Sequence, residues 1–577
     1  MGRRIRWVAL VLVVCFTLVL LQLVNIQFRK GPALADSPNN PRNQQQRYQN
    51  QRGLILAADG SILAQSVKSA PGTPWKYTRV YPGGTGASLY SSVVGYDSLE
   101  YGTAGVEYQY NSYLSAHSQP ARSLSQLLSP PPKTTDNVTL TIEPYLQATA
   151  SQAVAAIPGV DKDAAVVALD PQTGAVEADY SNPNFDPNAL ANPDVQTEEV
   201  AHYSYSQPDG ENFAPIVPMS TQDIFFPGST SKVVTSAAVY NLKPTLSGFT
   251  YPNDPQDSCL KLPNSNQSLC NDGTTIANST PCGGTMVEML PSSCDPGYGA
   301  LGIALGGDLL SQQANLFGYN SVPPIDLPFV VKSTFPAAAK LTGPNQAFAA
   351  YSAIGQYEVQ ASALQNAMIA ATVANGGLEM VPHVLSQIRQ SDGSLVKAYS
   401  PTVYQRAISS QAAASVTNDM LGVARTGTAA GVGFPASLDV AVKTGTAQTS
   451  QTADPARANV DWMIGFAPAS NPVIAVAVVV PEQNKSSDGA GVAGPIMKAM
   501  LVAAVAHAAA DGAVTGTTTT TRITTPAPRT APVAPTTAPS TTPASAAPTT
   551  TAPSTTPAAP ATTTGAPTPA TPVATTP

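Results

Sequence analysis

Ser229 and Lys232 are the residues of this chain whose types and spacing most directly suggest chemistry. A nucleophile and an amine three residues apart lie one turn apart on the same face of a helix. Pro227 and Gly228 suit a turn into that helix, which places Ser229 where unpaired backbone N–H groups stabilise developing negative charge. Because a serine hydroxyl needs a neighbouring base and an oxyanion site to act as a nucleophile, this segment predicts a nucleophilic serine.

The chain holds a second pair of the same spacing, Ser394 and Lys397. This pair follows Asp392-Gly393, a dipeptide typical of hairpin turns. We therefore expect Ser394 to begin an ordinary strand, and we assign the nucleophile to Ser229.

A partner for this pair is the run Lys443-Thr444-Gly445-Thr446. The residues before it alternate apolar and polar, as in a half-buried strand. Gly445 has no side chain, so a substrate backbone can approach the strand closely there. A similar run, Arg425-Thr426-Gly427-Thr428, follows residues typical of the end of a helix, which makes Gly427 a helix stop. We therefore assign the chemistry to Lys443 and place Arg425 in a loop.

Between these two motifs, Ser293-Cys294-Asp295 is our candidate for a third polar element. The alternative, Tyr251-Pro252-Asn253, follows Ser229 so closely that little chain remains for an intervening helical lobe. A second alternative is that the Ser293 triplet is only a turn. We favour Ser293 as a functional residue.

In this order the three motifs resemble the signature of the penicillin-binding proteins, which are penicilloyl-serine transferases. The similarity extends over about residues 36 to 510 and is greatest to class B proteins of the penicillin-binding protein A type. Other segments that resemble class B members are Arg52-Gly53-Leu54-Ile55, Gly105-Val106-Glu107, Ile354-Gly355-Gln356, Ala374-Asn375-Gly376-Gly377 and Trp462–Pro468.

The resemblance implies an α+β fold of the penicillin-binding and serine β-lactamase type, with an antiparallel sheet flanked by helices. It implies a D,D-transpeptidase of bacterial cell-wall synthesis, whose substrates are peptidoglycan stem peptides ending in D-Ala-D-Ala. β-Lactams are expected to inhibit it covalently. The resemblance implies no cofactor and no metal ion.

The resemblance also implies a role for each motif residue. Ser229 attacks the penultimate carbonyl and expels the terminal D-Ala, and the amine of a neighbouring stem then resolves the acyl-enzyme. Lys232 takes the serine proton when neutral, a form that burial and the nearby cation Lys443 both favour. Ser293 relays a proton to the leaving amine. The substrate carboxylate is held by Lys443, Thr444 and Thr446 on the strand that contains Gly445, and the backbone N–H groups of Ser229 and Thr446 form the oxyanion hole.

The chain departs from the family pattern at Asp295, where most relatives carry Asn. A carboxylate near Lys232 favours the ammonium form and so opposes its role as a base. Asp295 therefore either points elsewhere or shares its charge between the lysines. Our hypothesis is that it lies between Lys232 and Lys443 and sets which lysine is neutral. A second departure is Val217–Thr221, which contains no Asn-Arg-Ala element.

Two other functions compete with this interpretation. One is a β-lactamase or D,D-carboxypeptidase, in which water resolves the acyl-enzyme, but no Glu is clearly placed to activate that water. The other is a non-enzymatic wall-assembly scaffold, which the retained Ser229, Lys232, Lys443 and Thr446 argue against.

The N-terminal segment predicts a membrane anchor. Residues 1–6 carry three arginines, and residues 7–28 carry no charge, which is enough chain to span a bilayer core. The arginines favour a cytoplasmic N-terminus, with a single span and the bulk of the chain outside the bacterial cell membrane. A signal peptide cleaved after Ala33-Leu34-Ala35 is disfavoured by the length of the apolar run and by Arg29-Lys30 before that position.

The rest of the chain predicts three regions: a non-catalytic pedestal domain at 36–135, a transpeptidase domain at 136–510 and a disordered Thr/Pro/Ala-rich tail at 515–577. A stiff linker, Ser129–Pro132, lies between the first two. The pedestal is too short for a second large catalytic domain, so we expect a membrane glycan polymerase and other wall-synthesis proteins as partners. The expected strands lie near 164–170, 438–446 and 472–480, and the expected helices near 144–156, 230–240 and 361–375.

Composition argues against nucleic-acid binding, and the cysteine spacing favours disulfides over a zinc site. Only 11% of residues are charged and the net charge is −7, which offers no basic face for nucleic acid. Four cysteines cluster in an extracytoplasmic region, where disulfides persist. We prefer Cys259–Cys270 and Cys282–Cys294 because those loops are the shortest, the alternative being free thiols. A zinc site is disfavoured because the four histidines show no ligand spacing with these cysteines.

Overall fold

The computed structural model describes residues 2–26, 48–117, 134–157, 163–208, 213–271, 276–449 and 459–515. Three predictions from the sequence fall outside these residues: the alternative cleavage site at Ala33-Leu34-Ala35, the linker at Ser129–Pro132 and the tail beyond residue 515.

The first element, α1 (Gly2–Val24), is a 23-residue apolar helix whose length and composition suffice to cross a membrane. At a rise of about 1.5 Å per residue it is roughly 34 Å long, against a bilayer core of about 30 Å. It covers most of the span predicted at 7–28, whose last two residues are not described.

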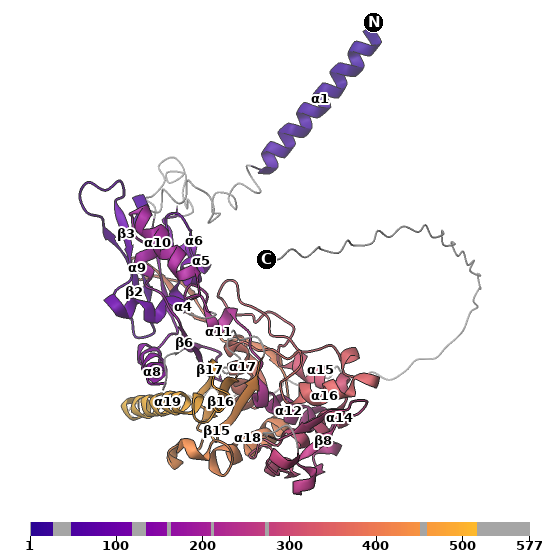
Figure 1. Ribbon diagram of the computed structural model, residues 1–577. Coiled ribbons are helices and arrows are strands. Elements are labelled where there is room, and N and C mark those ends of the chain that lie inside the picture. The colour runs from indigo at the N-terminus through magenta and orange to yellow at the C-terminus, as the bar shows by residue number, and fades with distance from the viewer. Residues whose placement is uncertain are drawn as a thin grey trace, which may run out of the picture. The chain divides into compact units, whose positions relative to one another are not determined.

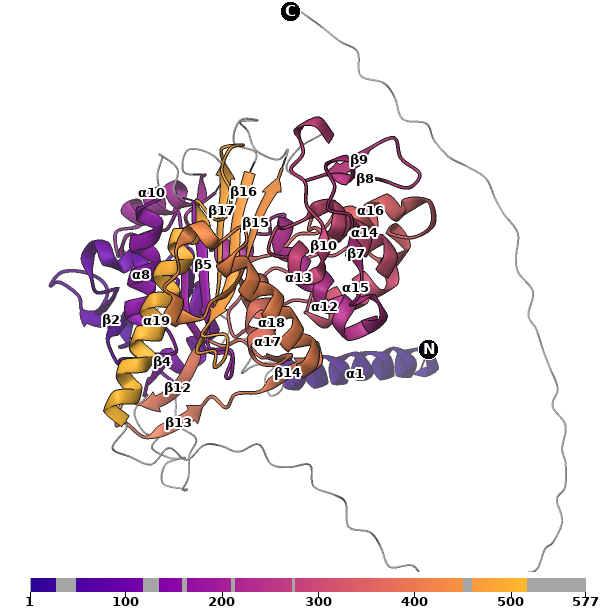
Figure 2. The ribbon, with the colours of Figure 1, turned by 90° about the horizontal axis from the view of Figure 1, so that it is seen from below.

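A five-stranded antiparallel sheet forms the centre of the larger region, in the order β15-β16-β17-β5-β6 (Figure 2). Every residue of β5 is buried, and β17 is buried along nearly all of its length, which accounts for their almost continuous Val and Ala runs. The strands are β5 (Ala164–Leu169), β6 (Val176–Asn182), β15 (Ala441–Gln448), β16 (Asn459–Ala467) and β17 (Ile474–Gln483).

Helices cover both faces of this sheet. On one face lies α19 (Ala493–Thr515), which contacts β16, β17 and α8 (Pro144–Ala155). On the other face lies α17 (Ala363–Ala374), which contacts β5, β16 and β17. The long apolar stretch in α19 is therefore explained by packing against the sheet. The structure confirms the predicted α+β class with an antiparallel sheet between helices.

The predicted elements correspond to observed ones. The three expected strands are β5, β17 and β15, although β15 begins only at Ala441 because Asp439 has a left-handed backbone, with φ of 46°. The three expected helices are α8, α17 and α12 (Lys232–Leu242).

A helical lobe packs beside the edge of this sheet at β15 (Figures 1 and 2). It contains two short antiparallel pairs, β7 (Thr250–Tyr251) with β10 (Gly284–Thr285) and β8 (Cys259–Lys261) with β9 (Ser268–Cys270). Its helices are α12, α13 (Met286–Met289), α14 (Asp295–Leu305), α15 (Gly307–Leu316), α16 (Gln346–Ala353) and α18 (Ser410–Arg425).

A second sheet, of six strands, joins segments that are far apart in the sequence. Its order is β13-β12-β4-β1-β2-β3. The strands come from both sides of the boundary predicted at residue 135, because β12 and β13 follow α17. Their bounds are β1 (Ile55–Leu56), β2 (Ile62–Lys68), β3 (Tyr77–Val80), β4 (Asp136–Leu140), β12 (Leu385–Gln390) and β13 (Leu395–Ala398).

A buried ionic cluster fixes the N-terminal part of this region. The carboxylate of Glu107 accepts hydrogen bonds from Arg52 Nε and Arg79 Nε, each at 2.6 Å. Opposite charges that satisfy one another in this way can remain buried.

The remaining α-helices and the last strand pair lie outside these two sheets and the helical lobe. They are α4 (Ser91–Val94), α5 (Gly105–Gln109), α6 (Asn111–Leu114), α9 (Pro187–Leu190), α10 (Val195–Ser206), α11 (Met219–Gln222), and β11 (Leu378–Met380) with β14 (Val403–Arg406).

Candidate active site

Ser229 lies on a 3₁₀ turn, η3 (Gly228–Ser231), and α12 begins at Lys232. The sequence predicted one α-helix for both residues; the structure places the serine on the tighter turn that leads into it. Gly228 has φ of 52°, and a Cβ there would lie 2.8 Å from the carbonyl oxygen of Thr446. Glycine is therefore required where the nucleophile turn packs on β15.

The amine of Lys232 is the centre of the site. Its Nζ lies 2.8 Å from Ser229 Oγ, 2.5 Å from the carbonyl oxygen of Ser293 and 2.5 Å from Asp295 Oδ1. The side chain is fully buried, and Nζ lies 5.7 Å from the centre of the Tyr298 ring. The structure thus brings the predicted nucleophile and the predicted base into direct contact.

Asp295 and Ser293 both lie at the lysine cluster, but they make different contacts there. Asp295 forms an ion pair with Lys232. Its carboxylate lies in the first turn of α14, where the helix dipole favours negative charge. The side chain between the two lysines is Ser293, whose Oγ lies 3.1 Å from Lys232 Nζ and 3.0 Å from Lys443 Nζ. The predicted contact of Asp295 with Lys232 is therefore present, and the side chain with contacts to both lysines is that of Ser293.

The backbone around this triplet is tightly constrained. Ser293 has φ of 54°, a conformation that non-glycine residues adopt rarely and often at functional sites. The next residue, Cys294, is fully buried and bonded to Cys282, and the second disulfide joins Cys259 to Cys270. Both preferred pairings are confirmed. The disulfide at Cys294 therefore holds the middle of the functional triplet.

The strand β15 supplies Lys443, whose fully buried amine also donates to the carbonyl oxygen of Thr444 at 2.8 Å. The glycine at 445 serves the packing of the chain itself. A Cβ at this position would lie 2.8 Å from both Pro227 O and Thr230 Cγ2, so the absent side chain admits the nucleophile turn. This close packing of the chain on itself differs from the predicted approach of a substrate backbone at Gly445.

Thr428 lies beside β15 and is not among the residues predicted from the sequence. Its hydroxyl lies 2.6 Å from the hydroxyl of Thr444, and its backbone N–H donates to Pro291 O at 3.0 Å. The available signal was the second Thr-Gly-Thr run, which we interpreted as a helix end. That interpretation is correct for α18, which ends at Arg425, but it overlooked the polar residue just beyond the helix.

The other residues set aside in the sequence lie in ordinary structural positions. Ser394 lies in the hairpin turn between β12 and β13, where its backbone N–H donates to Asp392 Oδ1 at 2.8 Å. Arg425, which we predicted to lie in a loop, is the last residue of α18 and forms an exposed ion pair with Asp439 at 3.0 Å. Tyr251 belongs to β7, which pairs with β10.

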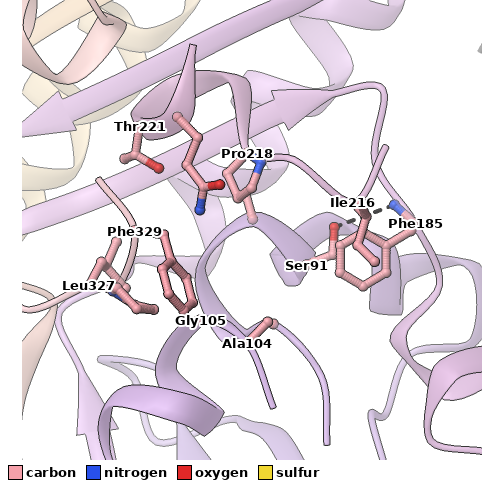
Figure 3. Close-up of a pocket in the computed structure, with 13 residues that line it drawn as sticks. Ser91, Ala104, Gly105, Phe185, Ile216, Pro218, Thr221, Leu327 and Phe329 are labelled. Carbon is pink, nitrogen blue, oxygen red and sulfur yellow. Dashed lines mark hydrogen bonds between the residues drawn. The ribbon is translucent and has the colours of Figure 1, made fainter. Parts of the chain in front are cut away.

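A small cavity of about 40 Å³ contains none of these site residues (Figure 3). It lies between Ser91, Gly105, Phe185, Pro218 and Phe329, and no titratable side chain lines it. A volume of this size holds only a few water molecules. This cavity is therefore separate from the cluster around Ser229.

The fold and this cluster define a serine transpeptidase of the penicillin-recognising class, and comparison with known families agrees. The model of the penicillin-binding protein transpeptidase domain matches residues 164–502, and that of the penicillin-binding protein A dimerisation domain matches residues 52–138. The chain belongs to the penicillin-binding protein transpeptidase family.

Within this family, the chain is similar to proteins of the penicillin-binding protein A type. It is 32% identical to the peptidoglycan D,D-transpeptidase PbpA of Mycolicibacterium smegmatis, over 88% of this chain and 99% of the relative. The PbpA of Mycobacterium tuberculosis is also 32% identical, with the same coverage. The ceftriaxone acyl-enzyme complex of penicillin-binding protein A from M. tuberculosis superposes with a TM-score of 0.69 at 31% identity, over 80% of this chain and all of that one. The penicillin G acyl-enzyme of the same protein gives a TM-score of 0.66 at 31% identity, over 79% of this chain and all of that one.

Proposed function

We propose that this protein cross-links peptidoglycan stem peptides that end in D-Ala-D-Ala, with Ser229 as the nucleophile. The observation that supports these roles is the direct contact of Ser229 Oγ with the buried amine of Lys232, at 2.8 Å. An acyl-serine mechanism requires a base within hydrogen-bond reach of the serine, and burial favours the neutral amine that can act as one.

The hydrogen-bond partners of Lys232 Nζ are compatible with a base that acts as a neutral amine. A neutral amine has two hydrogens and one lone pair, and two oxygens lie 2.5 Å from Lys232 Nζ, those of Ser293 and Asp295. If the amine donates to both, its lone pair is free for the Ser229 proton. Asp295 then acts as an acceptor that orients the amine, although its charge also favours the ammonium form.

The reaction then runs in two balanced steps. Ser229 Oγ bonds to the penultimate carbonyl carbon while its proton passes to Lys232, and the peptide C–N bond breaks. The terminal D-Ala leaves as an amine after receiving a proton through the hydroxyl of Ser293, which contacts both lysines. The amine of a second stem then displaces Ser229 from the acyl group, which forms the cross-link and returns the proton to the serine.

The substrate carboxylate binds along β15 in this proposal. Lys443 supplies the positive charge, and the hydroxyls of Thr444 and Thr446 supply donors. The backbone N–H groups of Ser229 and Thr446 stabilise the developing oxyanion, since preorganised donors of this kind contribute strongly to acyl transfer. Gly445 keeps this strand against the nucleophile turn.

The location and partners follow from the length of α1 and the size of the N-terminal region. We propose that α1 anchors the chain with residues 1–6 in the cytoplasm and the transpeptidase region outside. Glycan strands then come from a separate membrane glycan polymerase. Recovery of a mature protein that begins at Asp36, or polymerisation of lipid-linked disaccharide by the purified protein alone, would contradict this.

The nucleophile assignment is tested by covalent labelling with a fluorescent penicillin. Ser229→Ala should abolish labelling, while the matched variant Ser394→Ala should label like the wild type. Mass spectrometry should find the adduct on the peptide that contains Ser229, and an adduct on Ser394 would overturn the assignment. A long-lived adduct is expected of a transpeptidase, whereas rapid hydrolysis would indicate a β-lactamase.

A further inference from the structure

Asp461 is a buried acid directly beside the proposed carboxylate-binding strand. It is the register partner of Thr446 in the antiparallel pair β15–β16, so the two side chains point to the same face of the sheet. The residue is fully buried, and neither carboxyl oxygen makes a hydrogen bond of ordinary geometry among the described residues. A buried acid in this state requires an explanation.

The hydroxyl of Thr446 already has one fixed partner. Its Oγ1 accepts a hydrogen bond from the backbone N–H of Gly489 at 3.1 Å. Gly489 is packed against β15 so closely that a Cβ there would lie 2.5 Å from Gly445 O. Because a threonine hydroxyl has one proton and two acceptor positions, one acceptor position and the proton remain to be assigned.

We propose that Asp461 is a positioning residue that directs the Thr446 proton toward the carboxylate of the substrate. As a neutral acid, Asp461 donates to the second acceptor position of Thr446, and the hydroxyl proton is then free for the substrate. As a carboxylate, Asp461 accepts that proton itself and adds a negative charge behind the binding strand. The inference rests on the proposed function, because it assumes that Thr446 contacts the substrate carboxylate.

The change between these two states falls near neutral pH. Burial raises the pKa of Asp461 to about 7, with a further contribution from the neighbouring Asp488, while the hydroxyls of Ser487 and Thr446 lower it. Other charged groups on the adjoining segments are Glu482 at the end of β17 and Lys485 in the loop that follows. Lys443 on β15 is a further charged group, and its Nζ lies 3.3 Å from the hydroxyl of Thr444, two residues before Thr446.

The test measures acylation by a fluorescent penicillin, whose carboxylate stands for that of the substrate. For each full-length variant, apparent affinity and maximal acylation rate are determined at about pH 6 and about pH 8.5, on either side of the titration. The wild type should lose affinity by about tenfold at the higher pH, the scale of a lost hydrogen bond to a charged group. Asp461→Asn, which keeps a donor at all pH values, should show no such loss.

Three further variants serve as controls for this test. Thr446→Val removes the hydroxyl and should also remove the pH dependence of the affinity, and adding Asp461→Asn to it should change nothing further. Asp392→Asn, the same charge change in a distant exposed hairpin, should retain the wild-type ratio. If Asp461→Asn does not fold, Thr446→Val alone decides the question.

The outcomes separate this inference from the proposed function. Absence of labelling on Ser229 at every pH would contradict the function itself. Labelling that loses affinity at high pH equally in the wild type, Asp461→Asn and Thr446→Val would overturn only the role of Asp461.

Discussion

In the proposed mechanism Lys232 is the base, and the groups around its amine support that role. Its Nζ contacts a serine hydroxyl, a backbone carbonyl oxygen and a carboxylate, all within 2.8 Å, and its side chain is fully buried. Burial and Lys443 favour the neutral amine, while Asp295 favours the charged one. The balance between these effects sets the pH at which Ser229 becomes reactive.

Replacing Asp295 by Asn changes that balance in a direction that can be measured. Asp295→Asn removes the negative charge 2.5 Å from Lys232 Nζ and leaves the shape of the side chain. Because the ammonium form loses its partner, Lys232 should give up its proton at lower pH. The acid limb of the pH–acylation profile should therefore move to lower pH. An acid limb that moves to higher pH would show that Lys232 is not the base.

At the scale of the elements, two disulfides of nearly equal span have different positions relative to the site. Cys259–Cys270 closes the hairpin β8–β9, with a sequence separation of 11. Cys282–Cys294, with a separation of 12, ends in the triplet that contacts both lysines. Loops of similar length constrain the unfolded chain to a similar degree. Removing each disulfide in turn therefore distinguishes an effect on global stability from an effect on the position of the site residues.

The matched pair of variants follows from this comparison. Cys259→Ala/Cys270→Ala and Cys282→Ala/Cys294→Ala should lower the melting temperature to a similar extent. Only the second should also slow acylation by penicillin, by about tenfold or more, because small displacements of catalytic groups reduce rates strongly. Equal rates of acylation in the two variants would show that the triplet keeps its position without the disulfide.

The features that could be predicted are those set by residues close together in the sequence. The features that were missed are contacts between residues far apart in the sequence. Ser229 with Lys232, and the strand around Lys443, follow from local spacing and alternation. The contact of Thr428 with Thr444 and the pairing of Asp461 with Thr446 arise from tertiary packing and strand register, which no local pattern specifies. The disulfides were predicted because loop length alone favours the shortest pairings.

At the scale of the whole molecule, the six-stranded sheet connects the N-terminal region to the catalytic region. The strand β4 pairs with β1 on one side and with β12 on the other. The predicted pedestal at 36–135 therefore shares its sheet with residues of the predicted transpeptidase domain.

Truncation should reveal this dependence. A chain that begins at residue 136 loses β1, β2 and β3 and exposes the edge of β4, and exposed edges promote aggregation. It should form aggregates in size-exclusion chromatography and label poorly with penicillin. A chain that begins at residue 48 keeps the sheet and should remain free of aggregates and reactive with penicillin. Full labelling of the shorter chain would show that the catalytic region folds without its N-terminal strands.

Because β12 lies late in the sequence, the six-stranded sheet can be completed only late in synthesis. The free side of β4 gains its neighbour only when the chain reaches Leu385, about 245 residues after Leu140. At about 5 to 20 residues per second, the ribosome needs roughly 10 to 50 seconds to make that stretch. Throughout this interval β4 has an unpaired edge, so the nascent chain is susceptible to wrong pairing, or to capture by a chaperone, at this strand.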